Sequence, residues 1–128
     1  MGIVEEYILI TGDSQQEYGD NTVLLMQVGS FFEIYGLRDS EGKITGSKIT
    51  EIANICDLCV SAKTQTIGKK QVMMAGFGIT QREKYVKIIA ENGYHVVIYT
   101  QDLQMKNTSR SHDETVSPGT YFNNETDL

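Results

Sequence analysis

Phe31 and Glu33 are the residues of this 128-residue sequence whose types and spacing best suit recognition chemistry. They lie in the segment 31–36, FFEIYG, whose residue types predict a β-strand. Because alternate side chains of a strand point to opposite faces, Phe31, Glu33 and Tyr35 would share one face. That arrangement puts an aromatic ring, which can stack, about 7 Å from a carboxylate, which accepts hydrogen bonds. Taken alone, the Phe-x-Glu pattern favours a simpler interpretation, in which Phe31 is half-buried and Glu33 is solvated.

The pair Cys56-x-x-Cys59 is the second candidate, because this spacing occurs in redox centres and in zinc sites. A redox pair of the thioredoxin type opens a helix, whereas this pair closes a predicted one. A structural zinc ion would need two further ligands, and only two histidines are available. His95 lies in a predicted strand, and His112 lies in a predicted polar loop. We therefore expect two buried, unreactive thiols, with a redox or metal-sensing module as the alternative function.

Nothing in the composition or the motifs points to an enzyme. The sequences around Lys48 and Lys69 lack the full spacing of a phosphate-binding Walker A loop, so ATP hydrolysis is not encoded here. No serine or carboxylate is placed to form a catalytic triad with His95. We expect no catalytic residue, no metal and no cofactor in this domain.

The charge balance limits the partners that the chain can bind by itself. Seventeen acidic and eleven basic side chains give a net charge of −6, which argues against a stand-alone nucleic-acid binder. A protein-interaction domain is therefore a third interpretation. No apolar run reaches the roughly 20 residues that span a bilayer, and the opening residues carry acids where a secretory signal carries bases. We expect a soluble intracellular protein without a membrane partner.

The chain order of the elements predicts a single α+β domain, with a mixed β-sheet of about five to six strands and about three helices. The domain would occupy residues 1–120, and 121–128 would begin a linker to a further domain. Strand 22–28 is apolar throughout and suits the centre of the sheet. In strand 31–36, Phe32 and Ile34 would face away from Phe31. Helices are expected at 4–18, with an interruption near Gly12, at 48–58, and from a capping box at Thr80 and Glu83 to Asn92. Further strands are expected at 59–64, 72–76, 94–100 and 115–120. We also expect a hairpin tip at Lys69 and Lys70 and a polar loop at 105–114.

Four segments together resemble the DNA mismatch-repair protein family MutS. TVLLMQVGSFFEIYG at 22–36 is similar to the family segment that ends in its Phe-x-Glu motif, and MAGFG at 74–78 resembles its Met-Ala-Gly strand end. The stretch 92–101 resembles the Gly-Tyr-x-Val strand of the family, and VSPGT at 116–120 its closing Val-Thr-Pro-Gly-Thr. The sequence VGSFFEIYG at 28–36 most resembles that of the family branch found in large DNA viruses and octocoral mitochondria. The segments follow one another in the order and spacing of the family.

The resemblance implies the N-terminal mismatch-recognition domain of a larger dimeric clamp, whose ATP and Mg²⁺ sites lie in another domain. Its partner would be mismatched double-stranded DNA. Phe31 matches the wedge that stacks on a mispaired base, and Glu33 matches the carboxylate that hydrogen-bonds that base. Val28 falls where many members have an apolar residue under the groove, and Lys63 where many have a basic contact to the DNA backbone. Lys69 and Lys70 are further candidates for DNA contact.

Several positions depart from the family pattern. Gly78 and Thr80 replace a proline and a histidine, Ala62 replaces a common lysine, and an excursion at 38–47 lengthens the connection to the next helix. These changes affect the expected backbone contacts but not the expected wedge.

The physics of mismatch reading suits these two side chains. A mismatch lacks full pairing and stacking energy, so kinking the duplex there costs less than at a matched pair, and an inserted ring can offset that cost. A carboxylate at the same place repels phosphates and finds no free donor on matched DNA. Glu33 would therefore disfavour binding to ordinary duplex.

Overall fold

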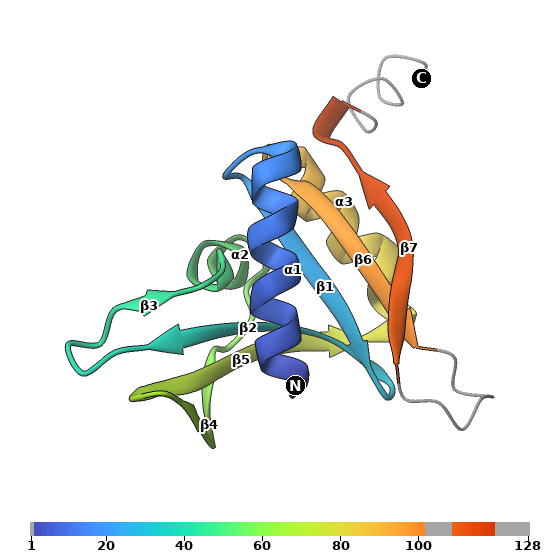
Figure 1. Cartoon of the computed structure of the whole chain (residues 1–128). Helices are drawn as coiled ribbons and strands as arrows, with labels where there is room; N and C mark the ends of the chain where they lie inside the picture. The colour runs from blue at the N-terminus through green and yellow to red at the C-terminus, as the bar shows by residue number, and fades with distance from the viewer. Residues whose placement is uncertain (1, 102–108, 120–128) are drawn as a thin grey trace.

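The computed structural model describes residues 2–101 and 109–119, which form a mixed sheet and its covering helices (Figure 1). This architecture confirms the expected α+β class, with seven strands in place of five to six. The helices are α1 (Ile3–Tyr18), α2 (Ile49–Cys56) and α3 (Arg82–Glu91), with a 3₁₀ turn η1 (Ile79–Gln81); the strands are β1 (Thr22–Val28), β2 (Phe31–Arg38), β3 (Ile44–Thr45), β4 (Ser61–Ile67), β5 (Lys70–Gly78), β6 (His95–Gln101) and β7 (Arg110–Val116).

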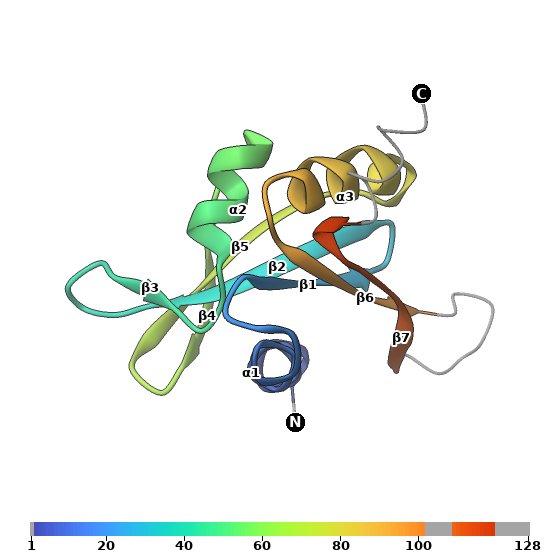
Figure 2. The same ribbon diagram turned by 90° about the horizontal axis from the view of Figure 1, so that it is seen from above.

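The strand order is β4-β5-β2-β1-β6-β7, and β3 pairs with β2. Only β1 and β6 run parallel; the other pairs are antiparallel. Seen from above, α1 covers one face of the sheet, and α2 and α3 cover the other (Figure 2). No helix in the described part of the chain is long and apolar enough to cross a bilayer.

Strand β1 lies at the middle of the sheet, as its apolar sequence predicts. Four consecutive residues, from Val23 to Met26, are at most 1% exposed, because helices pack on both faces. A strand of this kind cannot alternate between core and solvent. Strand β1 therefore packs against the helix layers on both faces of the sheet.

Helix α1 is continuous through Gly12, so the predicted interruption is wrong. A glycine inside a helix costs about 1 kcal/mol relative to alanine. That cost is outweighed here by a buried stripe that repeats with the period of a helix and packs against β1 and β2. The stripe consists of Val4, Tyr7, Thr11 and Ser14.

Strand β2 divides its side chains between the two layers. Phe32 is buried, and its ring centroid lies 5.9 Å from that of Phe77, which stacks at 4.5 Å on Tyr85 of α3. Tyr35 contacts α1 instead, with its ring centroid 5.3 Å from that of Tyr7. The predicted separation of the faces of this strand is therefore confirmed.

Several element boundaries differ from the sequence prediction: α2 ends at Cys56, β4 covers Ser61–Ile67, and β7 ends at Val116. The capping box at Thr80 is not formed, because no side-chain hydrogen bond caps α3. Instead, the Ile79 N–H donates to the Ser30 carbonyl (3.0 Å), which extends the β2–β5 connection into η1.

The expected loop at 105–114 is wrong from Arg110 onward, because β7 begins there. A polar sequence suits β7, because it is an edge strand that needs only one neighbour, β6. Residues 105–108, Thr120 and the expected linker at 121–128 lie outside the described residues.

Candidate nucleic-acid interface

Phe31 opens β2 immediately after the tight turn at Gly29 and Ser30. Its side chain is 52% exposed, an unusual value for a phenylalanine, whereas the neighbouring Phe32 is 2% exposed. Val28 is the direct partner of Phe31 across the β1–β2 pair, so the two side chains lie on the same face. The structure thus presents an aromatic ring to solvent beside an apolar neighbour.

The turn that carries Phe31 is fixed to the end of β6. The Gln27 amide Nε2 donates to the Gly29 carbonyl (3.0 Å), and the Gly29 N–H donates to Gln101 Oε1 (3.2 Å). The Gln101 N–H in turn donates to Gln27 Oε1 (3.0 Å). Gly29 has a φ of +61°, a left-handed conformation that glycine adopts at little cost. The position of the Phe31 backbone is therefore set by two strands.

Glu33 lies on the same face as Phe31, as predicted, but it is only 9% exposed. Its Oε1 atom accepts a hydrogen bond from the Tyr35 hydroxyl, which is itself buried. Burial raises the pKa of that hydroxyl, and the hydrogen bond to Glu33 raises it further, so Tyr35 remains a donor at neutral pH. The interpretation of Glu33 as a solvated residue is therefore wrong.

Gly76 is the residue of β5 beside which the Glu33 side chain is buried. It is the partner of Glu33 in the β2–β5 pair. A Cβ atom at this position would lie 2.7 Å from the Phe32 carbonyl oxygen and 3.6 Å from the Cγ atom of Glu33. The backbone of β2 thus comes too close to Gly76 for a larger residue, and the Glu33 side chain lies in van der Waals range of this position.

Lys63 on β4 approaches the same face of the sheet. Its Nζ atom lies 5.7 Å from the centroid of the Tyr35 ring, a distance suited to a cation–π contact. The strands here border a shallow hollow of about 290 Å³. It is lined by Phe31, Glu33, Cys59, Ser61, Met74, Ala75 and Gly76. Of the residues proposed from the sequence to contact DNA, the structure brings together Val28, Phe31, Glu33 and Lys63, and Cys59 lines the same hollow.

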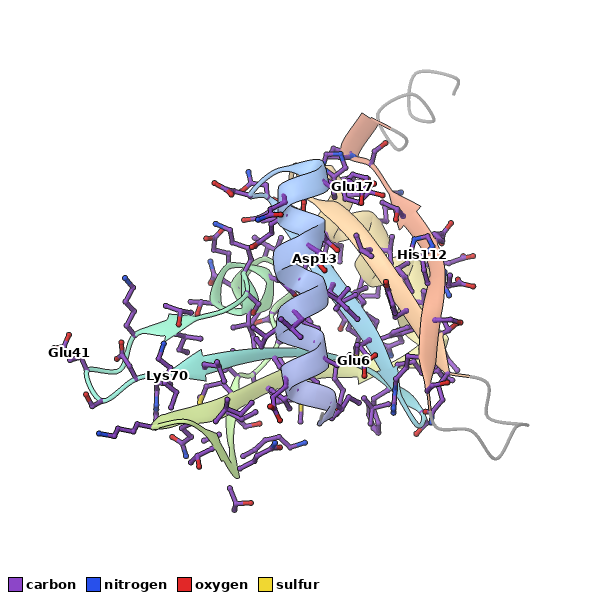
Figure 3. The ribbon with its side chains drawn as sticks, viewed as in Figure 1. Glu6, Asp13, Glu17, Glu41, Lys70 and His112 are labelled. Carbon is purple, nitrogen blue, oxygen red and sulfur yellow. The ribbon has the colours of Figure 1, made fainter. Side chains whose placement is uncertain are left out.

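Lys69 and Lys70 lie at the other end of the sheet, at the tip of the β4–β5 hairpin. Gln71 is paired with Arg38, seven residues along β2 from Phe31, or about 23 Å. Figure 3 shows Lys70 near the tip of its hairpin, with Glu41 at the end of the adjacent one. The two lysines are therefore not part of the hollow beside Phe31.

Arg110 is a basic residue near the site that the sequence did not reveal. Its Nε atom donates to the Gln27 carbonyl (2.9 Å), and its Nη2 atom donates to Gln101 Oε1 (3.4 Å). The guanidinium therefore lies against the same two residues that fix the turn before Phe31. Only the pairing of β7 with β6 places it there, and its polar sequence neighbours gave no signal of a strand.

The two cysteines differ in exposure, so the expectation of two buried thiols is wrong for one of them. Cys56 closes α2 and is buried, whereas Cys59 is exposed and lines the hollow. Asp57 takes a left-handed conformation (φ 55°), which turns the chain out of the helix between them. Burial raises the pKa of the Cys56 thiol to about 11. No group of three or more potential metal ligands occurs within residues 2–101 and 109–119.

Comparison with known proteins adds an independent result to this geometry. Residues 13–125 match the family described as MutS domain I. The curated protein "DNA mismatch repair protein MutS 2" of Halobacterium salinarum is 27% identical over 110 residues. The match covers 83% of this chain and 11% of that protein, so the chain spans about a tenth of the relative's length.

The close approach of β2 to Gly76, beside Glu33, can be tested by substitution of Gly76 with alanine. We expect Gly76→Ala to lower the free energy of unfolding by about 1–3 kcal/mol, because the new Cβ atom meets strand backbone. Gly78→Ala is a matched control, since that glycine has a φ of −65° and a Cβ atom there would make only an ordinary contact, 3.9 Å from the Thr80 hydroxyl oxygen. Urea unfolding of the two variants measures the difference, and equal stabilities would contradict the close approach of the two strand backbones at Gly76.

The cysteines should react at different rates with a thiol reagent in the native protein. Cys59 is expected to react quickly, because it is exposed, and Cys56 slowly, because it is buried and stays protonated until the pH nears 11. Counting the labelled thiols against time at pH 8 gives the result. Cys59→Ser should remove the fast phase alone; two fast thiols in the native protein would show that α2 does not protect Cys56.

Proposed function

This chain belongs to the MutS family, whose domain I it represents, and we propose that it reads mispaired bases by inserting Phe31 and hydrogen-bonding the base with Glu33. MutS domain I is a DNA-binding recognition domain and not a catalytic one. The observation that carries the proposal is the half-exposed ring of Phe31 on the same face as the carboxylate of Glu33. The fold itself would not require an exposed ring at Phe31 or a carboxylate at Glu33.

The exposed ring supports the role of a wedge. Phe31 keeps about half of its surface exposed to water after folding, so burying that half between bases gains stacking and hydrophobic energy that the free protein has not already used. The turn before it is fixed by Gln27 and Gln101, so insertion would not require the strand to move. At a mismatch, where unstacking costs least, this gain is most favourable relative to the cost.

The neighbouring polar groups support the role of a reader. The Glu33 carboxylate can accept a hydrogen bond from a base that has lost its pairing partner. On matched DNA the same carboxylate meets phosphates and no free donor, which disfavours binding. Lys63, on the same face, supplies a positive charge suited to a backbone phosphate.

We further propose that residues 1–120 work as one domain of a longer, dimeric MutS-like protein whose ATP and Mg²⁺ sites lie elsewhere. The 11% coverage of the relative and the net charge of −6 support this assignment. An acidic domain gains little from neutralising phosphates, so most of the affinity for DNA would come from the other parts of the assembly.

Phe31→Ala is expected to reduce the preference for mismatched over matched DNA by about tenfold or more in the complete natural protein. Stacking one base on an aromatic ring is worth about 1–3 kcal/mol, and 1.4 kcal/mol is a factor of ten. Folding should change little, because Phe31 is exposed. Binding titrations with both duplexes and thermal unfolding measure the two effects.

Phe32→Ala is the matched control for this substitution. Truncation of that buried ring should cost about 3–5 kcal/mol of stability. An equal loss of stability in the two variants would place Phe31 in the core and contradict the proposed wedge.

Glu33→Gln is expected to bind matched DNA more tightly than the wild type and to lose discrimination. The amide keeps the shape of the side chain and one acceptor oxygen, but it is neutral and no longer repels phosphates. Affinities for matched and mismatched duplexes of the same flanking sequence provide the measurement. An unchanged affinity for matched DNA would show that the charge of Glu33 does not disfavour ordinary duplex.

A further inference from the structure

We propose that Tyr35 is a positioning residue for mismatch reading, because its hydroxyl holds one carboxylate oxygen of Glu33 and leaves the other facing the hollow beside Phe31. This inference rests on the proposed function and extends it to a residue that does not touch DNA. Tyr35 is 1% exposed, so it cannot contact a base itself.

The two oxygens of Glu33 are in different situations. Oε1 accepts the hydrogen bond of the Tyr35 hydroxyl. Oε2 makes no hydrogen bond to any described residue, and it is not among the fully buried atoms that lack a partner. Oε2 therefore keeps some contact with solvent, and Glu33 is one of the residues that line the hollow. One oxygen is fixed by the protein, and one is available to a base.

Tyr35 is itself held in place from several sides. The edge of one ring meets the face of the other in its contact with Tyr7, at 5.3 Å and 82°. The Tyr7 hydroxyl donates to the Leu24 carbonyl (2.6 Å), which anchors α1 to the central strand. Lys63 lies 5.7 Å from the ring centroid of Tyr35. The hydroxyl that binds Glu33 is thus fixed by contacts from α1 and β4.

The value of this arrangement is that Glu33 is ordered before DNA arrives. A glutamate side chain has several rotatable bonds, and immobilising it during binding reduces affinity. Here the immobilisation takes place on folding, through the burial of the side chain beside Gly76 and the hydrogen bond from Tyr35. Phenylalanine in place of Tyr35 would preserve the packing but could not hold the carboxylate.

Tyr35→Phe, which removes only the hydroxyl, tests this role in the complete natural protein. We expect the ratio of mismatched to matched affinity to fall about three- to tenfold, the range that corresponds to immobilising one such side chain at binding. Tyr94→Phe is the matched control, because the hydroxyl of Tyr94, the residue before β6, also donates to a glutamate, Glu51 of α2. It should leave the ratio within about twofold. Equal effects of the two substitutions would overturn the inference.

A double-substitution cycle separates positioning from a general effect on the fold. In a Glu33→Ala background, Tyr35→Phe should cause no further loss of discrimination, because the carboxylate that it positions is absent. The same loss in both backgrounds would overturn the inference.

The parallel measurement of Phe31→Ala distinguishes the two levels of the proposal. If Phe31→Ala abolishes the preference for mismatches while Tyr35→Phe leaves it unchanged, the role of Tyr35 is wrong and the proposed function stands. If the wild-type protein shows no preference at all, both are wrong.

Discussion

The register of β2 is the constraint on which the candidate interface depends. Shifting this strand by one residue would turn Phe31 and Glu33 toward α3 and would expose Phe32. Two features oppose such a shift: β5 pairs with β2 along its whole length, and the turn at Gly29 is bonded to Gln27 and Gln101. The ring of Phe32, packed on Phe77, supplies the energy that makes this register the stable one. The core side of the strand thus determines what its other side presents.

The sequence predicts the parts of this arrangement that follow from local patterns. The continuous apolar run of β1 indicates a central strand, and the period of two in β2 separates Phe31 from Phe32. The burial of Glu33 could not be predicted in this way, because it depends on Gly76 in β5 and on the direction of the Tyr35 hydroxyl. Neither the spacing within β2 nor its composition contains that information.

Most of the other differences also originate in contacts between distant segments. The continuity of α1 at Gly12 follows from packing on the sheet, and the strand character of the polar β7 follows from pairing with β6. Arg110 reaches the site only through that pairing. Cys59 is exposed because α2 ends at Cys56 and the chain turns away at Asp57. For α1, β7 and Arg110, a local propensity was outweighed by a tertiary contact that no short window of sequence contains, whereas the exposure of Cys59 follows from the local turn at Asp57.

The distribution of charge suggests how an acidic domain can contribute to DNA recognition. Glu6, Asp13 and Glu17 lie along α1 (Figure 3), whereas Lys63 and Arg110 approach the face or the turn of Phe31. Such a domain adds little non-specific affinity, which would otherwise compete with discrimination at every matched site. The domain instead contributes to the difference in affinity between mismatched and matched duplexes. That difference requires opposite properties of the neighbouring residues Phe31 and Glu33. The ring must be free to leave water, and the carboxylate must already be held where a mispaired base will meet it.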